Sequence, residues 1–329
     1  MSTSPTDPPD ADAIAAALPR RPLGRTGLRV TPVCIGGGPL GGMEQLFGYA
    51  TPAERGVQTA LRAFEGPLNF LDTSNEYSGG ESERRIGEAI ARAGGLPDGF
   101  VLQTKVDRDT TTGEYSGARV RRSIEESLER LGLDRVPMLH LHDPEHISFE
   151  EGVAPGGPLE ELVRLRDEGI AEHIGVAGGP VALMSRYLQT GAFDALITHN
   201  RWTLIDRSAG DLISEAVDLG VAVLNAAPYG SGILATGTSG RLDYAYRPAD
   251  PAIVEQVRRM EELLAPAGVP LAAAALQFST RDPRIASTIV GVSRPERIEQ
   301  TAQLAAWPIP EELWPELERM AAPRETWQF

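Results

Sequence analysis

The chain has 329 residues, and the 41% that are hydrophobic are enough for one large domain or two ordinary ones. The formal net charge of −15 argues against nucleic acid and anionic membranes as partners, because both require clustered Lys and Arg. The single cysteine, Cys34, excludes an internal disulfide framework, and no run approaches the roughly 20 apolar residues of a membrane helix. We therefore expect a cytoplasmic protein.

The N-terminal segment, residues 1–18, is rich in Pro, Asp, Ser and Ala and lacks the basic and apolar regions of a signal peptide. It is predicted to be a disordered tail. No Pro- or Ser-rich linker divides residues 19–329, which we expect to form one domain. Glycines between Pro22 and Val30 predict a β-hairpin that could plug the bottom of a barrel.

From Val30 onward, short apolar runs alternate with longer amphipathic stretches. The apolar runs show little polar alternation, as expected for parallel strands buried on both faces. Strands are predicted over Val30–Ile35, Asn69–Asp72, Val101–Lys105, Val136–His142, His173–Ala177, Ala195–Thr198, Val221–Ala226 and Ile285–Val290. Helices are predicted over Pro52–Phe64, Ser82–Ala93, Ala118–Leu131, Leu159–Asp167, Val181–Gln189, Asp211–Asp218, Pro251–Leu264, Leu271–Thr280 and Pro295–Gln303, with Ser82 as an N-cap. Eight strands separated by helices predict an α/β fold, a closed (β/α)8 TIM barrel.

An open, doubly wound sheet is the main alternative fold. It predicts a Gly-x-Gly-x-x-Gly fingerprint that opens a helix after the first strand. The segment Gly36–Gly42 is rich in glycine, but Met43-Glu44-Gln45 follows it, and an acidic partner about 20 residues later is missing. The fingerprint is a poor match, and the barrel is favoured.

Polar residues end three successive predicted strands: Asp72, Lys105 and His142, with Tyr77 in the loop after Asp72. In a closed barrel these strand ends meet at the mouth, where barrel enzymes place their active sites. A Lys105 ammonium would lower the pKa of the Tyr77 phenol, and Asp72 would hold that ammonium in place. Tyr77 would then exchange a proton with a carbonyl or an alcohol. No side chain supplies the accompanying hydride, so a nicotinamide cofactor is implied.

The segments Leu71–Tyr77 and Gly80–Gly87 resemble the signature of the aldo-keto reductases, as do Arg130–Asp134 running into His142-Asp143-Pro144 and the late segment Gly291–Gln300. The resemblance implies a (β/α)8 barrel, use of NADP(H) and a catalytic tetrad of Asp72, Tyr77, Lys105 and His142. His142–Glu145 and Arg201–Leu204 resemble a branch of sugar 1-dehydrogenases that act on L-fucose, L-galactose or D-threo-aldoses, and on pyridoxal.

The resemblance also implies cofactor contacts, with NADP expected and NAD as the alternative. The loop after the seventh strand is similar to a pyrophosphate-binding loop, and Arg297, with Arg294 nearby, would hold a 2′-phosphate. The expected contacts are Gly37, His199, Asn200, Tyr229, Gly230, Ser231, Gly232, Leu234, Gly291, Ser293, Arg294, Arg297 and Gln300. The pattern departs at Ala177-Gly178, where the family has Ser-Asn, and at Ala226, where it has an aromatic residue.

Two other functional classes remain open. His140 lies on the same strand face as His142, and this pair with His199 could ligate a catalytic metal for hydrolysis, although we expect no metal site. We favour His142 over His140 for the tetrad, because His142 lies nearer the strand end. A barrel that keeps its cofactor as a sensor, without turnover, is the third class.

The expected partner is a small sugar or aldehyde substrate, and the expected state is a monomer or a weak homo-oligomer. The loops 42–50, 107–117, 143–157 and 236–247 would determine which substrate binds. Four aromatic residues either line the pocket or pack a loop: Phe47, Tyr115, Trp202 and Tyr246.

Overall fold

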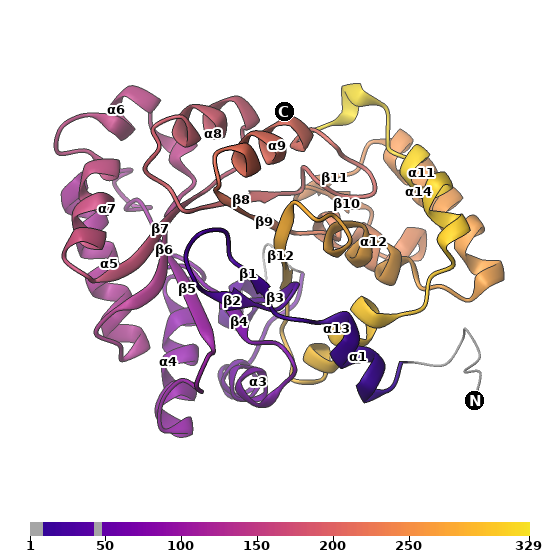
Figure 1. Ribbon diagram of the computed structural model, residues 1–329, viewed down its shortest axis with the longest axis horizontal. Coiled ribbons are helices and arrows are strands. Elements are labelled where there is room, and N and C mark those ends of the chain that lie inside the picture. The colour runs from indigo at the N-terminus through magenta and orange to yellow at the C-terminus, as the bar shows by residue number, and fades with distance from the viewer. Residues whose placement is uncertain (1–8, 43–47) are drawn as a thin grey trace.

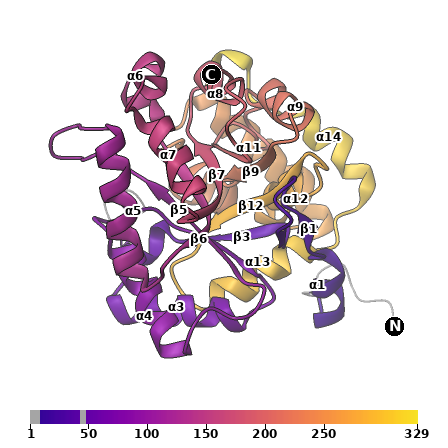
Figure 2. The same cartoon turned by 60° about the vertical axis from the view of Figure 1, so that its left-hand side comes forward.

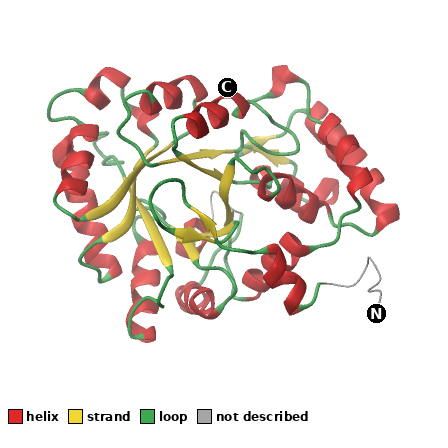
Figure 3. Ribbon diagram, viewed as in Figure 1, coloured by secondary structure: helices red, strands yellow, loops and turns green. Residues whose placement is uncertain are grey.

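A computed structural model describes residues 9–42 and 48–329 of the chain. Eight parallel strands close into a barrel in the order β12-β3-β4-β5-β6-β7-β8-β9, surrounded by helices (Figures 1 and 3). The barrel strands are β3 (Val33–Gly36), β4 (Phe70–Asp72), β5 (Val101–Val106), β6 (Val136–His142), β7 (Ala171–Ala177), β8 (Ala195–His199), β9 (Ala222–Ala226) and β12 (Ile285–Gly291). The (β/α)8 prediction is confirmed, and the doubly wound alternative is wrong.

The helices occupy the positions expected between the strands, and Figure 2 shows α4, α5 and α7 along one side of the barrel. They are α1 (Ala11–Ala17), α3 (Ala53–Glu65), α4 (Glu81–Ala93), α5 (Gly117–Leu131), α6 (Phe149–Val153), α7 (Pro158–Asp167), α8 (Val181–Leu188), α9 (Gly210–Asp218), α10 (Ile233–Thr236), α11 (Pro251–Leu264), α12 (Leu271–Thr280), α13 (Glu296–Ala306) and α14 (Trp314–Arg319). The sequence patterns missed the short helices α6, α10 and α14, because one or two turns leave too little periodicity to detect.

The strand predicted over Val30–Ile35 is divided in the structure. Arg29–Val30 forms β2, which pairs antiparallel with β1 (Arg21–Pro22), and the barrel strand β3 begins only at Val33. Leu23, in the hairpin turn, is fully buried in a cluster with Phe70 and Ala222, which open β4 and β9. The hairpin therefore covers the N-terminal end of the barrel and leaves the opposite end for the site.

The prediction of a disordered tail over residues 1–18 is wrong for its last part. Ala11–Ala17 forms helix α1, which begins where the Asp10 carboxylate accepts a hydrogen bond from the Ala13 amide at 2.9 Å. Ile14 and the buried Leu18 pack into the apolar cluster that includes α13, beside which α1 lies in Figure 1. A helix this short depends on tertiary packing, which composition does not reveal. Residues 1–8 lie outside the described part.

Helix α4 starts one residue earlier than predicted, and Ser82 is not its N-cap. The Ser82 hydroxyl instead donates to the Gly37 carbonyl at 2.8 Å and lies 2.8 Å from the Thr73 hydroxyl, so it ties the helix to β4. A side chain at Gly87 would place its Cβ 2.0 Å from the Arg130 carbonyl oxygen of α5. This glycine therefore sets how closely α4 and α5 pack behind the site.

Within the described residues, no single helix has both the length and the hydropathy to cross a membrane. Two consecutive helical segments, 251–267 and 271–280, meet both conditions only when they are taken together. The chain bends by 101° between them. Both parts contribute side chains to the apolar cluster around α14.

Candidate active site

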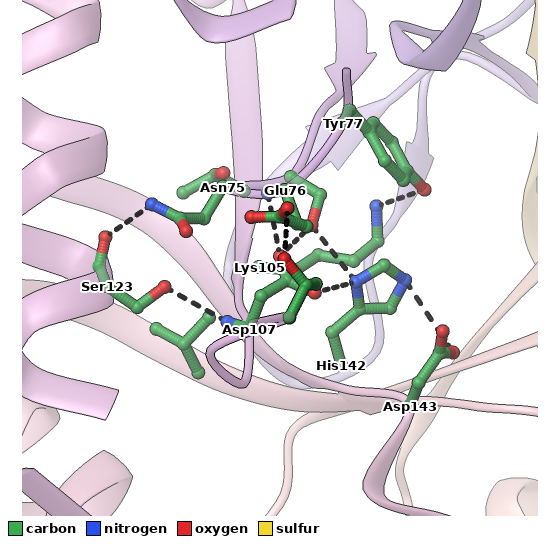
Figure 4. A network of polar contacts seen from close by, with 12 residues as sticks. Asn75, Glu76, Tyr77, Lys105, Asp107, Ser123, His142 and Asp143 are labelled. Carbon is green, nitrogen blue, oxygen red and sulfur yellow. Dashed lines mark hydrogen bonds and ion pairs between the residues drawn. The ribbon is translucent and has the colours of Figure 1, made fainter. Parts of the chain in front are cut away.

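Three predicted site residues meet at the carboxyl end of β4 and β5. Lys105 is buried, and its ammonium donates to the Asp72 carboxylate at 2.8 Å, the Thr73 carbonyl at 2.8 Å and the Tyr77 hydroxyl oxygen at 3.0 Å (Figure 4). These three hydrogen bonds use all three N–H groups of the ammonium. Because the Tyr77 oxygen accepts from Lys105, its own proton remains available for another acceptor.

Burial has the largest effect on the pKa of Tyr77 and raises it above its ordinary value, while the Lys105 charge lowers it only in part. Lys105 therefore acts on the phenol pKa in the expected direction, but burial, which the sequence does not show, outweighs it in the cofactor-free protein. Burial also lowers the pKa of Lys105, but Asp72 and Tyr77 outweigh it and the net pKa is raised. At neutral pH the pair is a neutral phenol facing a charged ammonium.

His140 is a core residue. Its Nε2 lies 3.1 Å from the Gln103 side-chain oxygen, and the Gln103 amide donates to Asp72 at 2.7 Å. Burial lowers the pKa of His140 well below its ordinary value, so the ring is neutral. A Cβ added at Gly175 would lie 2.2 Å from His140 Nδ1, so this nitrogen faces the wall of β7. His140 is therefore not placed beside His142 as the second metal ligand that the hydrolase alternative requires.

His142 completes the group of four, with its ring edge-on to that of Tyr77 at a centroid distance of 5.7 Å. Its Nδ1 lies 2.6 Å from the Asp107 carboxylate and 3.0 Å from the Ser74 hydroxyl (Figure 4). Burial lowers the pKa of His142, but Asp143 and Asp107 outweigh burial and raise it to about 8. Sequence reasoning missed Asp107 and Ser74. The only available signal was an aspartate two positions after Lys105, at the same strand end.

Next to His142, the mouth carries three further polar groups: Asp143, Glu145 and His199. Polar atoms of the three lie within 4.8 Å of one another. Burial raises the pKa of Glu145, and burial lowers that of His199 to about 4, so His199 is neutral. The Arg201 guanidinium donates to the His199 carbonyl at 3.1 Å and places positive charge beside the group. The three side chains thus place at the mouth polar atoms that could accept hydrogen bonds from a hydroxylated ligand or hold a cation.

The predicted pyrophosphate loop follows β9 and has an unusual backbone. Ala227, Gly230, Ser231 and Gly232 all have positive φ. The Gly230 and Gly232 amides donate within the turn, to the Ala227 and Tyr229 carbonyls, both at 3.0 Å. The Tyr229 hydroxyl is buried without a hydrogen-bond partner among the described residues, and the Arg297 charge lowers its pKa against a larger rise from burial. A buried hydroxyl without a partner, close to the Arg297 charge and beside a glycine-rich turn, fits a phosphate-bearing cofactor.

The remaining predicted cofactor residues fall into two groups. His199 and Asn200 follow each other at the end of β8, while Gly291, Ser293, Arg294, Arg297 and Gln300 extend from the end of β12 into α13. Arg294 and Arg297 are exposed and have no ion pair within the described residues, so both guanidinium groups are available to a ligand. Gly37 and Leu234 are buried. A Cβ at Gly37 would lie 2.7 Å from the Asp72 carbonyl oxygen, which explains this glycine by packing.

The four aromatic residues proposed for the pocket differ in place. Tyr115 packs a loop, since its hydroxyl lies 2.6 Å from the His142 carbonyl oxygen. Trp202 packs against Phe278, and Tyr246 is 44% exposed on a loop near Ser231, whose hydroxyl accepts from its amide. Phe47 lies outside the described residues.

Comparison with known proteins identifies the family and the fold of this chain. The aldo/keto reductase family model matches residues 32–322. L-galactose dehydrogenase of Arabidopsis thaliana is 31% identical over 85% of this chain and 86% of its own length. Pyridoxal 4-dehydrogenase of Microbacterium luteolum is 27% identical over 91% of this chain and 96% of its own. In fold, the aldo-keto reductase AKR11C1 from Bacillus halodurans matches with a TM-score of 0.75 at 22% identity, covering 93% of this chain and 97% of its own.

Proposed function

Because this chain belongs to the aldo/keto reductase family and is an NAD(P)-dependent oxidoreductase, we propose that it interconverts a sugar lactol and its lactone, or an aldehyde and its alcohol, with NADP(H) preferred. When bound, the nicotinamide supplies the hydride donor or acceptor. Tyr229, Arg294 and Arg297 would hold the phosphates beside the glycine-rich turn of residues 230–232.

Tyr77 is the proposed general acid and base. For reduction it donates its proton to the substrate oxygen, while the Lys105 ammonium 3.0 Å away stabilises the phenolate that remains. For oxidation the phenolate removes the hydroxyl proton. Because the phenol is protonated at neutral pH in the free protein, oxidation, which needs the phenolate, should accelerate as the pH rises.

The polar group formed by Asp143, Glu145 and His199 at the barrel mouth favours a polyhydroxylated substrate over a simple aldehyde. Carboxylates accept hydrogen bonds from hydroxyls and have nothing to bind in an apolar aldehyde. Replacement of Glu145 with Gln should raise KM for the aldose substrate by about tenfold, since a hydrogen bond to a charged group contributes roughly 1.5 kcal/mol. Glu150→Gln, an exposed position paired with Arg186 at 2.7 Å, is the matched control. Equal KM values for the two variants would contradict a sugar substrate.

The single observation that carries the proposal is the contact between the buried Lys105 ammonium and the Tyr77 hydroxyl. The direct test is a spectrophotometric screen of aldoses with NAD and NADP, and of aldehydes including pyridoxal with the reduced cofactors. Turnover that Tyr77→Phe abolishes supports the assignment. Cofactor binding with no turnover over the whole panel would instead support a sensor.

A further inference from the structure

Asp107 lies directly behind His142, on the side away from Tyr77 and the substrate face of the ring (Figure 4). We propose that Asp107 is a positioning residue, which holds the His142 ring with Nδ1 protonated and Nε2 turned toward the cavity as a charged hydrogen-bond donor to the substrate oxygen. This inference rests on the proposed function, since it assigns His142 a task in the same reaction.

The first step is the direction of the hydrogen bond. A carboxylate accepts only, so a separation of 2.6 Å between Asp107 Oδ1 and His142 Nδ1 requires the proton to be on Nδ1. In the neutral ring Nε2 would then lack a proton. In the cation, both ring nitrogens donate, and Nε2 gains the proton that a carbonyl or alkoxide oxygen needs.

The second step is that Asp107 is itself fixed. Its other oxygen accepts from the Ser74 hydroxyl at 2.5 Å and from the Glu76 amide at 3.0 Å. Its backbone amide donates to the Ser123 hydroxyl at 3.0 Å, and its backbone carbonyl accepts from Arg119 Nε at 3.0 Å. The carboxylate therefore cannot turn away from the imidazole without breaking several contacts.

The third step is the charge around the ring. Asp107 and Lys105 face His142 from the β5 end, Tyr77 faces it from the loop after β4, and His199 from the end of β8. His140 lies before it on β6, while Asp143 and Glu145 follow it. His140 and His199 are neutral, so the cationic ring is opposed by Lys105 and favoured by the carboxylates.

The two aspartates next to the ring differ in role. The Asp143 side chain is 39% exposed, and its carboxylate lies 3.7 Å from Nε2, which is the position a substrate oxygen would take. The Asp107 side chain is 11% exposed and contacts only the opposite nitrogen. Asp107 is thus the carboxylate that can keep acting on His142 while substrate is bound.

The test is nitrogen-15 NMR of the histidine side chains in the cofactor-free full chain, with the His142 signals assigned by their loss in His142→Gln. In the wild type we expect the Nδ1-protonated tautomer at high pH and a titration midpoint near 8. In Asp107→Asn, which keeps an acceptor but removes the charge, the midpoint should fall by roughly one pH unit. Asp109→Asn, in the same loop with Oδ1 bound to the Thr111 and Thr112 amides, should leave the midpoint unchanged.

An unchanged His142 midpoint in Asp107→Asn would overturn the proposal, and so would an Nε2-protonated neutral tautomer in the wild type, which needs no variant. The enzymatic arm is the pH profile of carbonyl reduction. Its falling limb should move to lower pH in Asp107→Asn, with about a fivefold loss of kcat/KM near pH 8 that approaches about tenfold at higher pH for a one-unit shift. Because the NMR arm requires no turnover, failure of the proposed reaction and failure of this inference give different results.

Discussion

The proton-transfer residues and the proposed cofactor-binding residues differ in how completely their polar groups are hydrogen-bonded within the described residues. On the side of β4 to β6, Lys105 uses all three of its N–H groups and both Asp107 oxygens accept hydrogen bonds. On the side of β9 and β12, the Tyr229 hydroxyl is buried without a partner, and Arg297 is unpaired within the described residues. The first side is organised before any ligand arrives, as proton transfer requires, whereas the second keeps polar atoms free for a ligand.

The largest effect should come from Tyr77→Phe, which removes the proposed proton donor from the β4 to β6 side of the mouth. We expect kcat to fall by about a thousandfold, within the range for loss of a general acid. The dissociation constant of the cofactor, measured by fluorescence titration, should stay within about twofold, because the tyrosine hydroxyl contacts Lys105 and not the binding side. Retained turnover would mean that another group moves the proton.

Lys105→Met tests whether the β4 to β6 side of the mouth also contributes to the stability of the fold. Removal of the ammonium leaves the buried Asp72 carboxylate without its charged partner, which typically costs about 3–5 kcal/mol of unfolding free energy. Denaturant unfolding would measure this cost, and the double variant Asp72→Asn with Lys105→Met should recover part of it. If the double variant is no more stable than Lys105→Met, the buried pair is not the source of the loss.

The protonation of His142 predicts a pH dependence of stability. Its folded pKa of about 8 lies above the ordinary value of 6.5, so the folded state binds the proton more tightly than the unfolded state. The resulting stabilisation, about 2 kcal/mol, is fully present below pH 6.5 and is lost as the pH rises through 8. The difference in unfolding free energy between wild type and His142→Gln should therefore shrink between pH 6 and pH 9. A constant difference would place the folded pKa near its ordinary value.

Arg297→Ala tests the β9 and β12 side of the barrel mouth, where the cofactor is proposed to bind. It should have the smallest effect of the four changes. Loss of a charge-assisted contact to a 2′-phosphate should weaken NADP binding by roughly tenfold and leave NAD binding nearly unchanged. Arg259→Ala, a surface arginine on α11 that contacts Gln256, is the matched control. Equal weakening of both cofactors would exclude the 2′-phosphate role.

The sequence by itself determined the barrel, because buried parallel strands separated by amphipathic helices leave a periodic signal that does not depend on long-range contacts. It also placed Asp72, Lys105 and His142 at strand ends, where parallel strands must bring them together. It could not reveal the contact between Asp107 and His142, since an aspartate after a strand also suits an ordinary turn.

Only the tertiary structure decided how strongly the site's pKa values shift, because burial of Tyr77 depends on how deeply neighbouring loops cover it. The same applies to helix α1, which is ordered through Ile14 and Leu18 packing on distant residues of the chain. Local patterns encode which face of an element is apolar, but the depth of burial and the identity of a distant partner arise only when the barrel closes.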